Sequence, residues 1–147
     1  MAGYMKKLQG YVYNGEFLSG EALANGIMAG LVTANGKTTV KKITADDTGL
    51  YRVVEKTTLF GKNAVILEMI KIGDAENFFV ENEWDINDAC DYNTAEYTLP
   101  VGKYVRMHRV LPGEQLITTD VADAAFTALA VGDNAVFGAT GVKKKTA

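Results

Sequence analysis

The chain has 147 residues, of which 48% are hydrophobic and 22% are charged, and its formal net charge is −3. This size and composition are typical of one folded domain, and they exclude a disordered chain, a transmembrane helix and a general electrostatic attraction to nucleic acid. A single cysteine, Cys90, excludes an internal disulfide, and fourteen threonines against one serine favour β-strands over helices.

The first predicted elements are an arm, a turn and a hairpin. Residues 1–10 lack periodicity, so we expect a flexible N-terminal arm there. Asn14-Gly15 predicts a tight turn, and residues 19–24 predict one helical turn capped by Ser19. Two strand-like segments then flank Asn35-Gly36, which is the strongest short-range signal for a hairpin.

The middle of the chain predicts a second hairpin and a long loop. Strand-like residues 50–57 and 64–72 flank a turn at residues 60–63. Residues 74–98 are acidic and aromatic without a clear period, so we expect a long loop with room for a strand or a helical turn. No linker rich in Pro, Gly or Ser divides the chain, which predicts one domain over residues 11–142.

The last third of the chain uses one phrase twice. Leu99-Pro100-Val101-Gly102 returns thirty residues later as Leu129-Ala130-Val131-Gly132, and each copy predicts a sharp turn, set by its glycine, that leads into a strand. We also expect a short helix near residues 123–129 and a solvated basic tail over residues 143–147. The predicted fold is therefore mainly β: a compact β-barrel or β-tulip-like domain with one or two short helices.

Two segments superficially match ligand-binding motifs. Residues 30–38 resemble a phosphate-binding loop, but five residues separate the glycines where the motif has four, and a strand rather than a helix follows. Residues 85–96 have carboxylates or amides at several calcium-loop positions, but Ala89 and Cys90 stand where a ligand and a glycine are needed. We expect a hairpin and an acidic surface loop, with opportunistic Mg²⁺ or Ca²⁺ binding at an oligomer interface left open.

The chain offers few groups for nucleophilic catalysis. A serine triad would need Ser19 with His108, and a thiol pair would need Cys90 with His108, because the chain has no other serine, cysteine or histidine. Ser19 lies outside a strand–turn–helix elbow, and a lone cysteine is more often a small buried hydrophobe. We therefore predict a protein that is not an enzyme and that has no cofactor, zinc site or small-molecule substrate.

Six residues are candidate contacts with another protein. They are Phe78, Phe79, Trp84, Tyr104, Arg106 and His108. The first three form an aromatic group of the kind that anchors interfaces, with simple core filling as the alternative. The last three alternate along one strand, which predicts a shared and partly exposed face.

Several short motifs resemble those of the head decoration (capsid accessory) proteins of tailed bacteriophages. The motifs are Ala22-Leu23-Ala24-Asn25-Gly26 before a strand, Leu99-Pro100-Val101-Gly102-Lys103, Pro112-Gly113-Glu114, and Leu129-Ala130-Val131-Gly132-Asp133 before a lysine-rich end. They are spread over most of the chain, whereas residues 37–98 match nothing. The resemblance transfers no catalytic residue.

The resemblance implies a β-rich structural protein that binds the major capsid protein on the outer surface of the virion, often as a homo-trimer. The resemblance further implies that such a protein stabilises the head and is assembled in the host cytoplasm. One alternative is a phage tail or head–tail connector protein that assembles as hexameric rings. Another is a small β-barrel module that binds a carbohydrate or a peptide through the aromatic loop at residues 77–92.

Overall fold

The computed structural model describes residues 1–7, 12–82 and 96–145. In this part of the chain the fold is mainly β, as predicted, with one short helix, α1 (Asp123–Ala128), where a helix is expected. The strands are β1 (Gly3–Lys7), β2 (Val12–Ser19), β3 (Leu23–Ala24), β4 (Met28–Ala34), β5 (Lys37–Lys42), β6 (Leu50–Leu59), β7 (Lys62–Lys71), β8 (Asn77–Val80), β9 (Thr98–Leu99), β10 (Tyr104–His108), β11 (Gln115–Thr118), β12 (Asn134–Gly138) and β13 (Gly141–Lys144).

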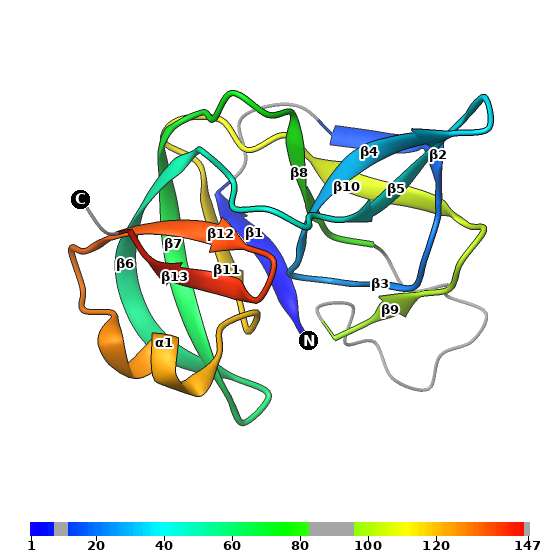
Figure 1. The fold of residues 1–147 in the computed structure, drawn as a ribbon. Coiled ribbons are helices and arrows are strands. Elements are labelled where there is room, and N and C mark those ends of the chain that lie inside the picture. Colours follow the sequence, from blue (N-terminus) through cyan, green and yellow to red (C-terminus); the bar gives the residue numbers. More distant parts are fainter. Residues whose placement is uncertain (8–11, 83–95, 146–147) are drawn as a thin grey trace.

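The strands form two halves that pack against each other (Figure 1). One half is an antiparallel six-stranded sheet in the order β1-β11-β7-β6-β12-β13. The other half is a small closed barrel in the order β10-β2-β5-β4-β8, in which β2 and β5 run parallel. The short strands β3 and β9 pair with each other. The predicted barrel is therefore one half of the fold.

Each half has its own hydrophobic core, and β8 contributes to both. Phe78 lies in the barrel core, where its ring meets Tyr13 edge-on with centroids 5.0 Å apart. The next residue, Phe79, lies in the core of the sheet half, with its ring centroid 6.3 Å from that of Phe137. Because successive side chains of a strand point to opposite faces, one strand joins the two cores.

The repeated phrase forms two equivalent turns, one in each half. Gly102 and Gly132 have φ angles of 81° and 92°, which confirms the predicted sharp turns. Their N–H groups donate to the carbonyls of Ser19 in the barrel (3.0 Å) and Val53 in the sheet (2.8 Å). The N–H groups of the same two strand residues donate back to the residue after each glycine. In both copies the leucine is buried and the valine is exposed. The first copy of the phrase thus attaches the start of β10 to β2, and the second copy attaches the start of β12 to β6.

The two predicted hairpins are confirmed. Asn35-Gly36 joins β4 to β5, and Phe60-Gly61 joins β6 to β7. Asn14-Gly15, in contrast, is not a turn, because it lies inside β2. Gly15 has a φ of 79°, and the pairing of β2 with β10 shifts register beside it. The dipeptide there forms a bulge, which supplies the bend that a small closed barrel needs.

The predicted helical turn at residues 19–24 is wrong. Ser19 ends β2, and its Oγ donates a hydrogen bond to the Pro100 carbonyl (2.8 Å) instead of capping a helix. Leu23 and Ala24 then pair with β9. The partners in these contacts lie about eighty positions away in the sequence, so a local pattern does not reveal them.

The N-terminal segment is a strand, which corrects the predicted arm. Residues 3–7 form β1, which pairs with β11 and lies between the two halves (Figure 1). A Cβ on Gly3 would lie 2.5 Å from the Cα of Gly26, so the close approach of these two segments depends on glycine. Residues 8–10 of the predicted arm lie outside the described part.

The first residues of the predicted basic tail are part of a strand, which corrects that prediction. Lys143 and Lys144 belong to β13, which pairs with β12. Their ammonium groups form ion pairs with Asp46 (2.6 Å) and Asp133 (3.5 Å). These lysines are therefore part of the folded sheet.

Candidate functional site

A mostly apolar row of side chains crosses the outer face of the barrel. The strand register pairs Val32 with Thr39, Thr39 with Leu18, and Leu18 with Tyr104. Directly paired residues point to the same face of a sheet, so the four side chains stand next to one another. Val32, Leu18 and Tyr104 are 42%, 41% and 61% exposed. We call these four residues the barrel row.

Strand alternation explains why the barrel row points outward. The residues that follow three of its members along their strands are Ser19, Val40 and Val105, and all three are buried. Val40 and Val105 belong to the barrel core. The barrel core is therefore filled by one set of alternate positions, and the barrel row occupies the other set.

A second set of paired residues on the barrel, Met28, Phe79 and His108, is covered. Met28 pairs with Phe79, and Phe79 pairs with His108. All three are buried, and Met28 and Phe79 belong to the core of the six-stranded sheet. The sheet half therefore covers these residues and leaves the barrel row uncovered among the described residues.

A groove of about 730 Å³ adjoins the barrel row at Val32. Leu31 and Ile43 give it an apolar lining, and Glu21, Lys41 and Lys42 add charges of both signs. Gly30 widens it, because this residue has no side chain to fill the space. The groove and the barrel row together form one continuous surface on the barrel.

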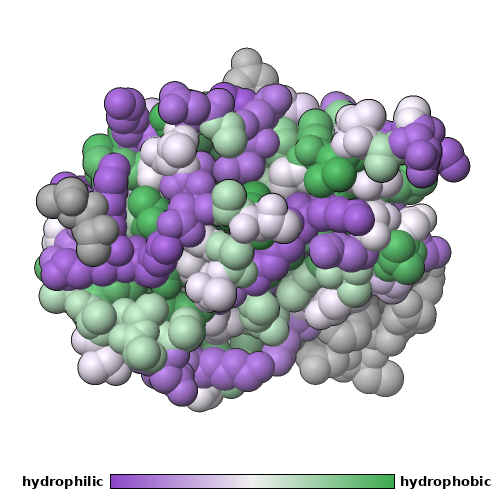
Figure 2. Space-filling view, in the orientation of Figure 1, coloured by the Kyte–Doolittle hydropathy of each residue, from purple (hydrophilic) through white to green (hydrophobic). Residues whose placement is uncertain are grey.

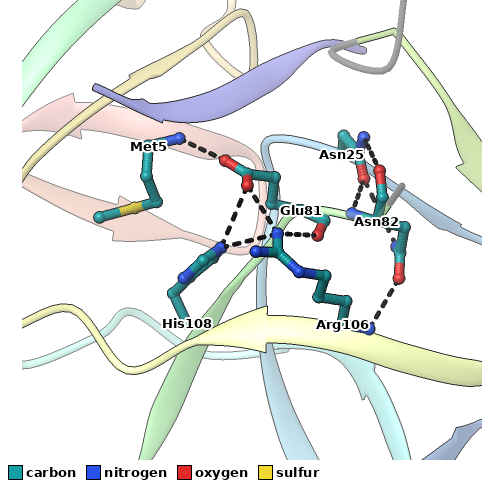
Figure 3. A network of polar contacts seen from close by, with 6 residues as sticks. All are labelled: Met5, Asn25, Glu81, Asn82, Arg106 and His108. Atoms are coloured by element: carbon teal, nitrogen blue, oxygen red, sulfur yellow. Dashed lines mark hydrogen bonds and ion pairs between the residues drawn. The ribbon is translucent and has the colours of Figure 1, made fainter. Parts of the chain in front are cut away.

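A polar network joins the barrel to β1 (Figure 3). The Glu81 carboxylate accepts hydrogen bonds from the Met5 N–H (2.5 Å) and from Arg106 Nη1 (2.7 Å). Its Oε1 also lies 3.2 Å from His108 Nε2. His108 Nδ1 is buried and has no hydrogen-bond partner within the described residues. Because its donors come from β1 and β10, the carboxylate holds these two strands together.

Two buried asparagines extend this network (Figure 3). Asn82 donates its N–H to Asn25 Oδ1 (2.6 Å), and Asn25 Nδ2 donates to the Asn82 carbonyl (3.0 Å). The Arg106 N–H donates to Asn82 Oδ1 (2.8 Å). Buried amides that bond one another in this way fix the position of the backbone on both sides.

The electrostatics of Glu81 follow from these contacts. Burial alone would raise the pKa of Glu81, but hydrogen bonds from His108, the Met5 N–H and Arg106 outweigh it, so the pKa lies below its ordinary value. The carboxylate is therefore ionised at neutral pH and balances the Arg106 guanidinium. Both of its oxygens are engaged by groups of the chain itself.

Three of the predicted contact residues are buried, which corrects their assignment. Phe78 and Phe79 fill the two cores, so the core-filling alternative describes them. His108 shares a strand face with Tyr104, as predicted, but it is fully buried rather than partly exposed. His108 is buried because of the tertiary structure: Glu81 and the sheet half cover this end of β10.

The other predicted residues have different outcomes. Tyr104 is exposed and belongs to the barrel row, whereas the Arg106 side chain is 21% exposed and bonded to Glu81. Trp84 and Cys90 lie outside the described residues, as does the candidate calcium loop except for its last position.

The sequence analysis missed Leu18, Val32 and Thr39. Alternation along each strand indicates which side chains share a face, but not which face remains uncovered. That depends on the register of four strands, one of which is about sixty residues from the others. Figure 2 shows hydrophilic and hydrophobic areas interleaved over much of one face of both halves, with a weakly hydrophobic area at the lower left over α1.

The described residues contain no group of three or more His, Cys, Asp or Glu side chains suited to a metal ion. In the same ranges, no helix has the length and apolar character needed to cross a membrane. Comparison of the chain with protein-family models, with curated proteins and with solved structures finds no match.

Proposed function

We propose that this chain is a non-enzymatic structural protein of a tailed-phage virion that binds the outer surface of the capsid and stabilises the head. The observation that carries the proposal is the barrel row, an apolar strip on a closed barrel that no described part of the chain covers. The motifs that resemble those of head decoration proteins support the same function.

The barrel row has the composition of a contact surface. Tyrosine is enriched at protein interfaces because its ring buries a large area at a small cost in conformational entropy. Single exposed apolar side chains are ordinary on protein surfaces. Leu18 and Tyr104 are paired on neighbouring strands, however, and Thr39 of β5 is paired with both Leu18 and Val32, so a partner can bury all three apolar side chains at once.

In this proposal the partner is the major capsid protein, and the chain acts as a homo-trimer on the outside of the virion. Each copy then needs only a modest contact, because linked contacts bind about 10²–10⁴ times more tightly than single ones. Light scattering of the purified protein tests the oligomeric state. A trimer is expected, and a hexameric ring would favour the tail or connector alternative.

Co-sedimentation with empty heads tests the proposed function. The empty heads are assembled without this chain, from the major capsid protein of the phage that the proposal assigns it to. We expect the wild-type protein to sediment with the heads, and the double variant Leu18→Ser, Tyr104→Ser to remain in the supernatant. Ile70→Ser is the matched control, because Ile70 is also 41% exposed but lies on β7 of the sheet half.

The outcomes of this experiment are distinct. If the wild-type protein does not bind heads, the proposed function is wrong. If the double variant binds as well as Ile70→Ser, another surface makes the contact. A thermal melt of each variant confirms that it is folded, since substitutions on the surface change stability by only about 0.5 kcal/mol.

Peptide binding is a second candidate function, favoured by the groove beside Val32. Its apolar lining and its charges of both signs suit an extended segment with mixed side chains. Peptide and glycan arrays test this alternative. A signal that is lost in Leu31→Ser would support it, because Leu31 lines the groove.

A further inference from the structure

Two hairpins of this protein end in loops of the same geometry. Asn35 and Gly36 have φ angles of 51° and 74°, and Phe60 and Gly61 have φ angles of 52° and 75°. Each pair forms a two-residue loop between paired strands. Positive φ at both positions is typical of the type I′ turn, in which asparagine or glycine is preferred at the first position. Phenylalanine is bulky and has no short polar side chain to stabilise this conformation, so Phe60 is strained where Asn35 is not.

Little side-chain packing offsets the backbone strain at Phe60. It is 38% exposed, and it is not among the side chains that form or pack against the three hydrophobic clusters of the described residues. Strained residues are concentrated at binding sites, because the surrounding structure supports a conformation that folding alone would not favour. An exposed aromatic ring at the apex of a hairpin is suited to enter a pocket on another protein.

We propose that Phe60 is a second anchor on the capsid, which inserts into an apolar pocket of the major capsid protein bordered by a carboxylate. This proposal rests on the proposed function and adds a contact residue to it. Lys62 supplies the charge argument: its side chain is 59% exposed and is paired with exposed Glu96 at a distance of 4.0 Å. Such an exposed pair contributes little, so the ammonium group is available to a carboxylate on the partner.

The position of Phe60 makes the chain a bridge between capsid subunits. In Figure 1 the β6–β7 loop lies at the bottom of the sheet half, away from the barrel at the upper right. The shared packing of Phe79 and Phe137 holds the two halves in a fixed relation. The barrel row binds one capsid subunit and Phe60 binds a neighbouring one, so that each molecule links two subunits of the head.

The substitution Phe60→Asn tests the proposal, because it places the preferred residue in the turn. We expect the free variant to have a Tm equal to or above that of the wild type, since strain is removed. Its affinity for empty heads should fall roughly tenfold or more, as expected when one of two linked contacts is lost. Its protection of the heads against heat should be lost as well.

Two further variants serve as controls. Phe60→Leu keeps an apolar side chain at the apex and should retain most of the binding and protection. Asn35→Phe introduces phenylalanine into the matching β4–β5 turn. We expect its Tm to lie below that of the wild type, and the difference measures how much phenylalanine destabilises this turn.

The results distinguish the two proposals. If Phe60→Asn protects heads as well as the wild type does, Phe60 is not an anchor and the proposed function stands. If the wild-type protein does not bind heads, both proposals are wrong. A smaller oligomer of free Phe60→Asn in light scattering would show that Phe60 joins copies of this chain, which overturns the bridge. A lower Tm for Phe60→Asn would refute the strain argument.

Discussion

At the scale of single residues, Glu81 stabilises the edge of the six-stranded sheet. β1 is the last strand on one side of that sheet, and its Met5 N–H is bonded to the Glu81 carboxylate. A buried donor that loses its acceptor costs roughly 1–3 kcal/mol. Arg106 would lose its charge partner at the same time. The Glu81 carboxylate therefore accepts a hydrogen bond from a backbone N–H and balances the charge of a guanidinium.

Glu81→Gln should lower the free energy of unfolding by about 1–3 kcal/mol at neutral pH. Because the pKa of Glu81 is lowered by folding, its stabilising contribution is present above the unfolded value of about 4.3 and is lost as the pH falls below it. Urea unfolding of the wild type and the variant should therefore give a difference that shrinks in acid. A difference that is the same at every pH would contradict this role.

The informative quantity is the difference in the free energy of unfolding between the wild type and Glu81→Gln. Burial raises the pKa of Asp120, with Lys42 opposing the shift, so Asp120 adds stability in acid rather than removing it. That contribution is present in both proteins and cancels when they are compared.

Gly132→Val should lower the free energy of unfolding by about 1–3 kcal/mol, the usual cost of a strained backbone. Gly132 has a φ of 92°, and nothing lies within 4 Å of the position that a Cβ would occupy, so the cost comes from the backbone alone. Gly132→Asn is the control, since asparagine tolerates this conformation better. Equal Tm values for Gly132→Val and the wild type would refute the argument.

At the scale of elements, one dipeptide adopts two structures in this chain. Asn35-Gly36 forms a hairpin loop and Asn14-Gly15 forms a bulge, although both glycines have a positive φ. Asn35 also has a positive φ but Asn14 does not, so the sequence predicts the conformation of the glycine in both places and that of the asparagine only in the hairpin loop. It does not predict the outcome for Asn14-Gly15, because the distant strand β10 pairs across that position. The repeated Leu-x-Val-Gly phrase could be predicted as a turn for the same local reason, whereas its partners Ser19 and Val53 could not.

Gly26→Ala should release β1 from its place between the two halves. Gly26 has a φ of 92°, and a Cβ there would lie 2.5 Å from the carbonyl oxygen of Ala2, so the N-terminal strand must shift. We expect faster tryptic cleavage after Lys6 and faster amide exchange in β1. Gly36→Ala is the matched control, because its φ is 74° but nothing lies within 4 Å. Equal cleavage of the two variants would show that the contact is unimportant.

At the scale of the whole molecule, burial depends on how the halves meet. Alternation along β10 correctly places Tyr104 and His108 on one face, yet Tyr104 is 61% exposed and His108 is fully buried. The sheet half covers one end of that strand and not the other, and no local pattern contains this information. For the same reason, Phe78 and Phe79 could be predicted as large apolar side chains but not assigned to separate cores.

Phe78 and Phe79 provide a test of the coupling between the halves. Both are fully buried neighbours on β8, so Phe78→Ala and Phe79→Ala should each cost about 3–5 kcal/mol. Phe79→Ala removes packing between the barrel and the sheet half, whereas Phe78→Ala removes packing within the barrel. Urea unfolding should therefore broaden and its m-value fall for Phe79→Ala, because the halves no longer unfold together.

Phe78→Ala should lose a similar amount of stability while keeping the wild-type m-value. Amide exchange can separate the two halves, since strands of the barrel and of the sheet are expected to open at different free energies only in Phe79→Ala. A Phe79→Ala protein that unfolds in one transition with the wild-type m-value would show that β1 and the Glu81 network couple the halves without this ring. The proposed bridge between capsid subunits requires that coupling, because a molecule whose halves move independently would bind two subunits without holding them together.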